Sequence, residues 1–355
     1  MDWLILALGL VLLIFGADLL VRGAARLATN FGVPALVVGL TVVAFGTSAP
    51  ELAVSVRSAW AGQAELAVAN VVGSNIFNIL VVLGVAALVS PLMVSQQLIR
   101  QDVPIMVIVS LILVVMAWSG SISTWNAALL VMGLIAYTTF LFYQGRKQGK
   151  ETVDEDVDAI LNTPKPLSQN IVMVVAGLVL LVMGARWLVD SAVSIASALG
   201  VSEAVVGLTI VAAGTSLPEV MTSIMAAFKG ERDIAIGNAV GSNVFNILCV
   251  LGVSGLVSPE PLLAGVQMAR VDLPIMLGVA VLCMPLFFTG AILDRIEGAL
   301  FLTLYVAYLW YMVAVAQAHS YLPLLKTGIL YGLVPVVLIY LVGALVHDLR
   351  KRKVS

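Results

Sequence analysis

Residues 39–91 read GLTVVAFGTSAPELAVSVRSAWAGQAELAVANVVGSNIFNILVVLGVAALVSP, and residues 207–259 read GLTIVAAGTSLPEVMTSIMAAFKGERDIAIGNAVGSNVFNILCVLGVSGLVSP. The two stretches align without a gap at a constant offset of 168 residues, and 31 of their 53 positions are identical. Shared hydrophobicity alone does not produce identity at this level. The chain therefore contains an internal duplication, which predicts the organisation of the fold.

The composition around the two copies is that of a membrane protein. The 355 residues are 61% hydrophobic and only 11% charged, whereas soluble domains carry about 25% charged residues. The net charge of −2 comes with no basic face, which argues against a nucleic-acid partner. The lipid bilayer is the partner that this composition predicts.

The apolar segments are long enough to be membrane-spanning helices. A helix needs about 20 mostly apolar residues to cross the bilayer core. These segments are continuously apolar rather than alternating, which excludes a β-barrel. We expect an all-α integral membrane protein with eleven spans. They lie near residues 3–24, 33–60, 66–90, 102–119, 124–143, 168–198, 201–229, 233–257, 271–289, 293–315 and 327–347.

The basic residues orient these spans, because cytoplasmic loops carry an excess of lysine and arginine. With the N-terminus outside, only Arg57, Arg186, Arg270 and Lys326 face outward, and the other 14 of the 18 basic residues face inward. An even number of spans would leave the basic C-terminal tail outside. We therefore expect an N-out, C-in, multi-pass protein of the cell (plasma or inner) membrane.

Each copy of the duplication falls within a unit of five spans, which is an odd number. The second unit therefore enters the membrane from the opposite side, as an inverted repeat typical of secondary transporters with a substrate site near the midplane. We expect a ten-helix inverted-repeat core and one extra C-terminal transmembrane helix. The expected boundaries are 1–145 for the first repeat, 146–167 for a cytoplasmic linker, 168–316 for the second repeat, and 317–355 for the extra helix and basic tail.

Both copies contain the motif Gly-Thr-Ser-x-Pro-Glu, at residues 46–51 and 214–219, well inside an apolar segment. One interpretation is local, because the motif serine and glutamate fit a helix capping box with proline in the first turn. A helix that begins in mid-span is also a broken helix. Irregular backbone at that depth is tolerated only where it lines a cavity, so the motif predicts such a break in both copies.

Glu51 and Glu219 occupy equivalent places in the two halves. An ionised carboxylate near the bilayer centre costs at least a few kcal/mol unless something compensates it. The two would meet across the pseudo-symmetry axis, where one divalent cation would neutralise both. Carboxylate, hydroxyl, amide and carbonyl oxygens suit Ca²⁺. No histidine or cysteine accompanies them, which argues against zinc, copper and iron.

The second repeated motif, Gly-Ser-Asn-x-Phe-Asn-Ile-Leu, occupies residues 73–80 and 241–248. Its serine and its last asparagine are four residues apart and share a helix face. Their oxygens could complete a cation site or bind neighbouring helices, and the glycine of each motif predicts close helix approach. The middle asparagines, Asn75 and Asn243, point elsewhere, so packing or hydrogen bonding is at least as good an interpretation for them.

Charged residues occupy equivalent places on the first span of each repeat. Asp18 and Arg22 lie four residues apart, and Arg186 and Asp190 repeat this spacing with the signs reversed. The spacing predicts intrahelical ion pairs near the membrane interface. The acidic run within residues 151–158 lacks the spacing of a Ca²⁺-binding loop and indicates a solvated linker.

At its paired motifs the sequence resembles the Ca²⁺/cation antiporter superfamily, specifically the prokaryotic Na⁺/Ca²⁺ exchanger branch. The resemblance covers about residues 1–315. It implies a ten-helix core with a central cluster of ion positions that Ca²⁺ and Na⁺ occupy alternately, and first and sixth spans that slide over this core. Glu51 and Glu219 would be the bidentate Ca²⁺ ligands and would also hold Na⁺. The other ligands implied are the carbonyls of Ala44, Thr47, Ala212 and Thr215, the hydroxyls of Ser48, Ser74, Ser216 and Ser242, and the amides of Asn78 and Asn246.

The sequence departs from the best-known members of this branch, in which aspartate occupies one of the last two positions. With asparagine at both, the site offers two negative charges rather than three, so one Ca²⁺ balances it. We expect secondary-active exchange of Ca²⁺ for Na⁺. Exchange of Ca²⁺ for H⁺ on the same scaffold is the alternative, because buried carboxylates can take up protons near neutral pH.

Two other classes of function fit the sequence less well. A passive cation channel would give gradient-independent flux and needs no duplicated broken-helix site. An intramembrane enzyme would use the glutamates as acid and base, but no nucleophile or metal-ligand set accompanies them. We therefore expect no enzymatic activity and no cofactor, and the sequence implies no obligate protein partner.

Overall fold

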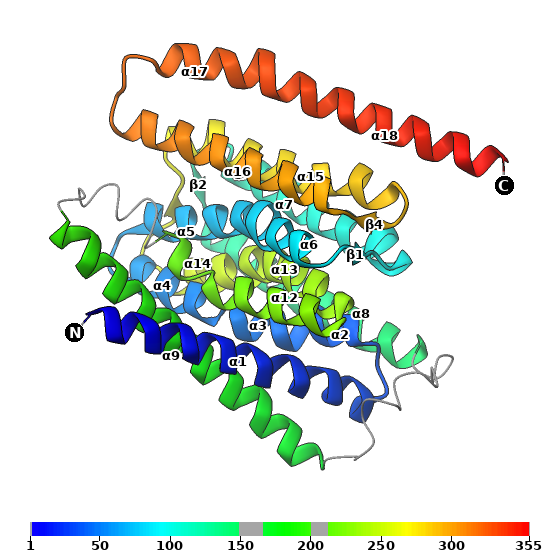
Figure 1. Cartoon of the computed structure of the whole chain (residues 1–355). Coiled ribbons are helices and arrows are strands. Elements are labelled where there is room, and N and C mark those ends of the chain that lie inside the picture. The colour runs from blue at the N-terminus through cyan, green and yellow to red at the C-terminus, as the bar shows by residue number, and fades with distance from the viewer. Residues whose placement is uncertain (1, 149–165, 200–211, 355) are drawn as a thin grey trace.

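The computed structural model describes residues 2–148, 166–199 and 212–354, and this part of the chain is almost entirely helical (Figure 1). Elements labelled η are turns of π-helix. The first half contains α1 (Asp2–Phe31), α2 (Ala35–Val38), η1 (Gly39–Val43), α3 (Ala44–Thr47), α4 (Ala49–Trp60), α5 (Ala64–Phe77), η2 (Asn78–Leu83), α6 (Gly84–Val89), β1 (Leu92–Met93), η3 (Leu98–Asp102), α7 (Val103–Ala117), β2 (Ser121–Ile122) and α8 (Thr124–Gln148).

The second half repeats this order. It contains α9 (Leu167–Ala198), α11 (Ala212–Gly214), α12 (Leu217–Lys229), α13 (Arg232–Phe245), η6 (Asn246–Leu251), α14 (Gly252–Val257), β3 (Leu262–Leu263), η7 (Met268–Asp272), α15 (Leu273–Phe288), β4 (Ile292–Leu293) and α16 (Arg295–Ala316), followed by α17 (Leu322–Gly328), η8 (Ile329–Leu333) and α18 (Val334–Val354). Most of the expected linker at 146–167, with its acidic run, lies outside the described residues.

Nine helices in the described chain are long and apolar enough to cross a membrane. The bent pair formed by α2–η1–α3 and α4 makes a tenth span. The remaining expected span, near residues 201–229, lies partly outside the described residues, and its described part is α11 and α12. The predicted all-α membrane fold is confirmed.

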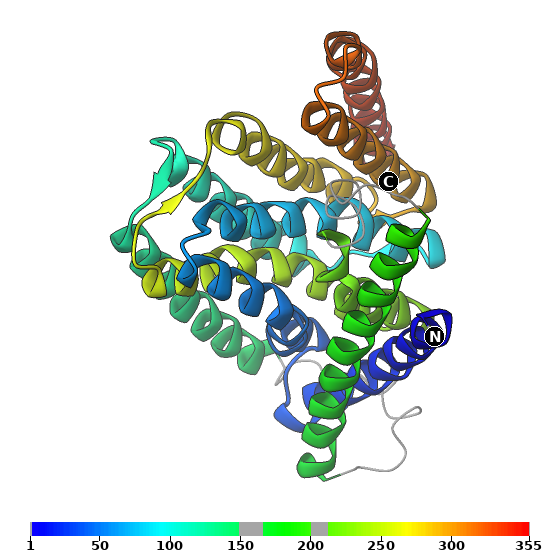
Figure 2. The same ribbon diagram turned by 90° about the vertical axis from the view of Figure 1, so that its left-hand side faces the viewer.

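The spans that carry the Gly-Ser-Asn motif form the middle of the bundle. α5–η2–α6 and α13–η6–α14 are the most buried spans, and α4 and α12, which follow the two Gly-Thr-Ser turns, pack against them. In Figures 1 and 2 the long helices α1 and α9 lie together on one side of this core, and α17 and α18 lie on the opposite side. The extra C-terminal helix is therefore remote from the centre.

Two short antiparallel strand pairs join the two halves. β1 pairs with β4, and β2 pairs with β3, so each pair takes one strand from each half. The register partners are Leu92 with Leu293, Met93 with Ile292, Ser121 with Leu263, and Ile122 with Leu262. The sequence did not predict these strands, because a segment of two residues carries no alternating pattern.

The packing of α1 on α9 depends on glycines spaced seven residues apart. Gly9 and Gly16 of α1 face Gly184 and Gly177 of α9. A Cβ atom built on Gly16 would lie 2.8 Å from the backbone nitrogen of Leu181, and one built on Gly177 would lie 2.8 Å from the carbonyl oxygen of Gly16. Backbones that approach this closely need glycine on both helices, which is a common basis of helix packing in membranes.

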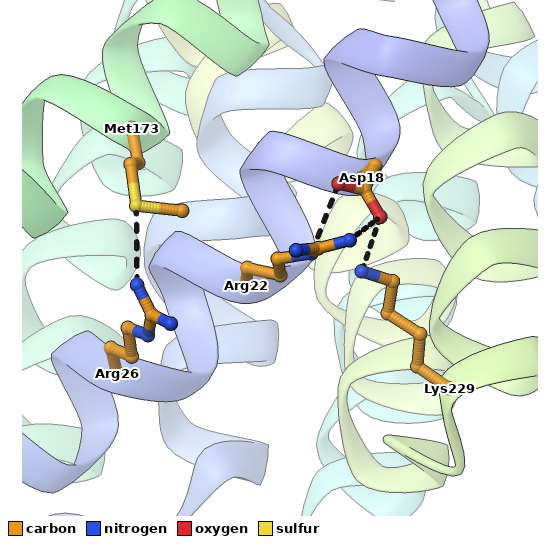
Figure 3. Close-up of polar contacts among 5 residues, drawn as sticks. All are labelled: Asp18, Arg22, Arg26, Met173 and Lys229. Atoms are coloured by element: carbon orange, nitrogen blue, oxygen red, sulfur yellow. Dashed lines mark hydrogen bonds and ion pairs between the residues drawn. The ribbon is translucent and has the colours of Figure 1, made fainter. Parts of the chain in front are cut away.

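A charged cluster joins α1 to α12 (Figure 3). Asp18 forms an ion pair with Arg22 at 3.0 Å and a second one with Lys229, in the last turn of α12. The predicted pair within α1 is thus confirmed, and it also ties this helix to α12. In the described part of the chain no ion pair joins Arg186 and Asp190, so the equivalent pair predicted on α9 is not found.

Gly16→Leu is expected to separate α1 from α9, because the new side chain would overlap the α9 backbone. We expect a loss of about 1–3 kcal/mol, as at other overpacked sites, seen as a lower Tm of the detergent-purified protein. Gly278→Leu in α15 is the control, since no described residue lies within 4 Å of a Cβ built there. Equal Tm values for the two variants would contradict the role given to the glycine contact.

Candidate cation-binding site

The second span bends by 46° inside the first Gly-Thr-Ser-x-Pro-Glu motif. Ser48 leaves the helical conformation (φ −78°, ψ 5°), and the proline that follows lies in the first turn of α4, as predicted. In the second copy Ser216 has the same conformation (φ −91°, ψ 8°), and α12 begins directly after it. The motif therefore starts a new helix in both copies and carries its glutamate on the first turn.

The serine of each motif does not cap its own helix but reaches the glutamate of the other copy. Neither Ser48 nor Ser216 makes a side-chain capping bond. Instead, Ser216 Oγ donates to Glu51 Oε1 at 2.9 Å, and Ser48 Oγ donates to Glu219 Oε1 at 3.3 Å. The capping-box interpretation was wrong, because both hydroxyls are used across the interface between the copies.

Both glutamates are fully buried, with 0% of each residue exposed. Ser74 Oγ lies 3.5 Å from Glu51 Oε1 and 3.3 Å from Ser216 Oγ. The second oxygen of each carboxylate, Oε2, has no hydrogen-bond partner among the described residues. Neither of the two ion pairs found among those residues involves a motif glutamate. The two carboxylates therefore present free acceptor oxygens and have no positive partner in the described chain.

Thr47, Ser242 and Ala44 form one flank of the site. Thr47 Oγ1 lies 3.5 Å from Ser242 Oγ and 3.4 Å from the carbonyl oxygen of Ala44, which Ser242 Oγ also contacts at 3.5 Å. On the other flank the Thr215 hydroxyl is buried and has no partner within the described chain. Ala212, the remaining predicted carbonyl ligand, is the first residue of α11.

Asn78 and Asn246 are fully buried and begin the π-helical turns η2 and η6. Such turns within α-helices occur frequently at functional sites. η2 packs against α12, and η6 packs against α4, the helices that carry the glutamates. Both polar atoms of Asn78 are unpaired in the described structure, as is Asn246 Oδ1, whereas Asn246 Nδ2 donates to Asn75 Oδ1 at 3.1 Å. Two amide oxygens are therefore available on elements that contact the glutamate helices.

The donor set of the site consists of oxygen atoms. Carboxylate, hydroxyl, amide and main-chain carbonyl oxygens are the ligands that Ca²⁺ prefers. In the described residues there is no group of three or more histidine, cysteine, aspartate or glutamate side chains able to hold a metal ion. The buried acceptors without donors fit a hard cation as a transported substrate better than a resident zinc or iron centre.

Two asparagines that the sequence analysis did not single out hold the main chain at the glutamates. Asn70 Nδ2 donates to the carbonyl oxygen of Glu51 at 3.3 Å and to Ser55 Oγ at 2.9 Å. Asn238 Nδ2 makes the same two bonds in the second copy, at 3.2 Å to the motif glutamate's carbonyl oxygen and at 3.0 Å to Ser223 Oγ. Their identity in the two aligned copies was the only sequence signal for them.

Asn75 and Asn243 bind each other's main chain at the centre of the bundle. Each side-chain nitrogen donates to the other residue's carbonyl oxygen, at 3.2 Å in both directions. Each nitrogen also contacts a methionine sulfur, Met276 at 3.7 Å for Asn75 and Met106 at 3.6 Å for Asn243. The hydrogen-bonding interpretation of these asparagines is confirmed, and their reciprocal bonds join the two halves.

Asn75→Ala and Asn243→Ala are each expected to lower the free energy of unfolding by about 1–3 kcal/mol, because each leaves buried polar groups unpaired. Unfolding of the detergent-purified protein measures this loss. The double variant is expected to lose less than the sum of the single losses, since the two residues share one network. Additive losses would show that the two side chains do not act as a pair.

Comparison with known proteins places the chain in a family. The family model for the sodium/calcium exchanger protein matches residues 1–143 and 169–314. The chain is 38% identical over 303 residues to the putative antiporter CaxA of Alkalimonas amylolytica. The alignment covers 84% of this chain and 95% of the relative. It is 33% identical over 346 residues to the sodium/calcium exchanger MaX1 of Methanosarcina acetivorans. This alignment covers 87% of this chain and 97% of the relative.

A solved structure has the same fold. It is that of the sodium-calcium exchanger NCX_Mj, soaked with 2.5 mM Na⁺ and 0.1 mM Ca²⁺. The TM-score is 0.74 at 31% sequence identity, and the match covers 89% of this chain and 97% of that chain. The family match includes both copies of the duplication. The chain belongs to the sodium/calcium exchanger family of membrane cation antiporters.

Proposed function

We propose that this protein is a secondary-active antiporter that exchanges Ca²⁺ for Na⁺ across the cell membrane by alternating access. Membership of the exchanger family and the antiporter relatives support coupled cation exchange. The proposal adds Na⁺ as the coupling ion and assigns the binding residues. Glu51 and Glu219 are the ligands that Ca²⁺ and Na⁺ share, and the neutral oxygens around them complete the ion positions.

The observation that carries the proposal is the pair of buried carboxylates without a counter-charge in the described chain. Removing each charge from water costs several kcal/mol, and two like charges at one site repel each other. A bound cation offsets both costs. Because each glutamate also accepts a bond from a serine of the other copy, a cation held by both carboxylates contacts both halves of the protein.

The charge of the site bears on the coupling ratio. Asparagine at both position 78 and position 246 leaves two carboxylates as the only negative charges among the proposed ligands. One Ca²⁺ neutralises two charges, and so do two monovalent cations. A third Na⁺ would leave a net positive charge in a buried site, which is costly. We therefore expect two Na⁺ per Ca²⁺.

Exchange of Ca²⁺ for H⁺ is the second candidate, and the same buried pair favours it. A carboxyl group removed from water and placed beside a second carboxyl group binds protons more readily than one in solution. Two protons would neutralise the site as two Na⁺ do. Hydroxyls and main-chain carbonyls around the glutamates are oxygen ligands for a metal cation, which is why Na⁺ is the preferred coupling ion here.

The duplicated architecture suits alternating access. In this proposal the repeats at residues 1–145 and 168–316 exchange roles between an outward-open and an inward-open state, as inverted repeats do in other transporters. The linker at 146–167 lies on the cytoplasmic side, and the helix within 317–355 is an accessory to the core. The N-terminus is outside, in accordance with the distribution of lysine and arginine.

Liposomes that contain the purified protein are expected to take up Ca²⁺ when Na⁺ trapped inside is diluted outside. An outward H⁺ gradient at equal Na⁺ is expected to drive no uptake. Uptake driven by H⁺ alone would transfer the assignment to a proton exchanger with the two glutamates as the titrating groups. Uptake without either gradient would indicate a channel.

The coupling ratio is tested by changing the membrane potential in the same liposomes. Two Na⁺ per Ca²⁺ moves no net charge, so the initial rate of Ca²⁺ uptake is expected to stay constant when a K⁺ gradient with valinomycin sets the potential. A rate that increases when the interior is made negative would contradict the ratio of two Na⁺ per Ca²⁺. It would mean that positive charge moves inward with Ca²⁺, as it would if one Na⁺ left for each Ca²⁺ that entered. A rate that increases when the interior is made positive would instead indicate three Na⁺.

Glu51→Gln and Glu219→Gln are each expected to reduce Na⁺-driven Ca²⁺ uptake by about 100-fold or more, the effect of removing one member of a buried charged group. Glu260→Gln is the matched control, because Glu260 is exposed and lies in the connection between α14 and β3. Uptake that survives both substitutions in the motif would overturn the proposed site.

A further inference from the structure

The two flanks of the site differ, although their sequences are copies of each other. Asn238 is fully buried, and its Oδ1 accepts a hydrogen bond at 3.0 Å from Thr47 Oγ1 of the other copy. The equivalent residues, at the constant offset of 168, are Asn70 and Thr215. Asn70 is half-buried, and no hydrogen bond joins the Thr215 hydroxyl to it. The bond between the copies is therefore made on one flank only.

The glycine that follows Asn238 in the second repeated motif, Gly241, lies at a close contact between the copies. A Cβ atom built on Gly241 would lie 2.8 Å from Leu40 Cα and 2.8 Å from Ala44 Cβ, so α13 packs directly on the segment that leads to Thr47. With the offset of 168, the equivalent contacts of Gly73 involve residues 208 and 212, and residue 208 lies outside the described part of the chain. The expected close approach is thus found at Gly241. The flank that has the cross-copy hydrogen bond between Thr47 and Asn238 is closely packed.

We propose that Asn70 and Asn238 are positioning residues that make one cross-copy bond in turn during transport. Through Nδ2, each asparagine donates a hydrogen bond to the carbonyl oxygen of the glutamate in its own copy. Through Oδ1, it accepts a hydrogen bond from the threonine hydroxyl of the other copy when its flank of the site is closed. The bond from Thr47 to Asn238 belongs to the state seen here, and the bond from Thr215 to Asn70 replaces it in the alternate state. This inference rests on the proposed exchange function.

The amide group links closure of a flank to the geometry of the ion ligands. In Asn238 one planar group contacts the glutamate main chain on one side and the Thr47 hydroxyl on the other. Making or losing the threonine bond therefore changes the surroundings of a proposed ligand. Because one such bond forms as the other breaks, the two states keep similar energies, and a modest difference in ion binding is enough to shift their populations.

The distribution of charge indicates which face each bond closes. Asn238 lies on α13, which follows Lys229 and begins at Arg232, and the expected orientation places both basic residues on the inner face. Asn70 lies on α5, close after the turn at 61–63, which the same orientation places on the outer face. The bond between Thr47 and Asn238 would then close the inner side of the site, and the bond between Thr215 and Asn70 would close the outer side.

Thr47→Val and Thr215→Val test the proposal, because each removes a hydroxyl but keeps the side-chain shape and the main-chain carbonyl. Apparent Ca²⁺ affinity is measured from each face in proteoliposomes of known orientation. Thr47→Val is expected to raise the Ca²⁺ affinity at the inner face and to lower it at the outer face. The ratio of the two affinities is expected to change about three- to tenfold, which is the effect of one hydrogen bond on a two-state equilibrium. Thr215→Val is expected to change the ratio in the opposite direction, and the double variant to restore it.

Thr41→Val is the matched control, since the Thr41 hydroxyl is buried in the same segment but bonds only locally, to the carbonyl oxygen of Val37 at 2.6 Å. It is expected to leave the ratio unchanged. Shifts in the same direction at both faces, or no shift in either threonine variant, would overturn the proposal. Only a conformational role, and not a loss of stability, predicts opposite signs for the two variants.

Hydrogen–deuterium exchange of the purified, ion-free protein provides a readout that does not depend on transport. Thr47→Val is expected to speed amide exchange in residues 44–48 about three- to tenfold relative to wild type, and Thr41→Val to leave it unchanged. Unchanged exchange in Thr47→Val would overturn the inference. If the variants show these exchange differences but the wild-type protein moves no Ca²⁺, the proposed function is overturned and the cross-copy bond remains supported.

Discussion

Two carboxylates buried in an apolar bundle, without a positive partner in the described chain, are the constraint on which the rest of the structure depends. Glu51 and Glu219 are fully buried in this structure, so polar groups of the protein and a bound cation must stabilise their charges. The broken helices make this possible, because a helix that starts in mid-span frees main-chain carbonyls and places the glutamate on its first turn. The serines of the motif then join each glutamate to the opposite copy.

The two kinds of contact between the copies have different consequences. The reciprocal bonds between Asn75 and Asn243 are the same in both directions, so they can persist when the two halves exchange roles. The bond from Thr47 to Asn238 has no equivalent on the other flank in the described residues. A symmetric contact at the centre thus holds the halves together, while an asymmetric contact at the edge of the site distinguishes the two states.

Much of this arrangement could be predicted from the sequence, because the duplication carries it. The helical spans follow from the apolar segments and the mid-span break from the first repeated motif, and the structure confirms both. The family follows from the repeated motifs, and the comparisons with known proteins confirm it. The capping-box interpretation of the motif serines was wrong, because the spacing of Ser48 and Glu51 fits a capping box as well as a bond to another helix. Only the packing of the copies decides between the two. Three features could not be predicted, because they leave little local pattern in the sequence. These are the hydrogen bonds of Asn70 and Asn238, the π-helical turns and the two-residue strands. The different hydrogen bonds of Thr47 and Thr215 cannot be predicted from the sequence, because the threonine and the asparagine concerned are identical in the two copies.

Whether the two glutamates share one cation can be measured by calorimetric titration of the purified protein with Ca²⁺ in the absence of Na⁺. We expect one Ca²⁺ bound per chain, competition by Na⁺, and loss of the same binding event in Glu51→Gln and in Glu219→Gln. Two Ca²⁺ bound per chain, with each substitution removing only one of them, would contradict a shared site.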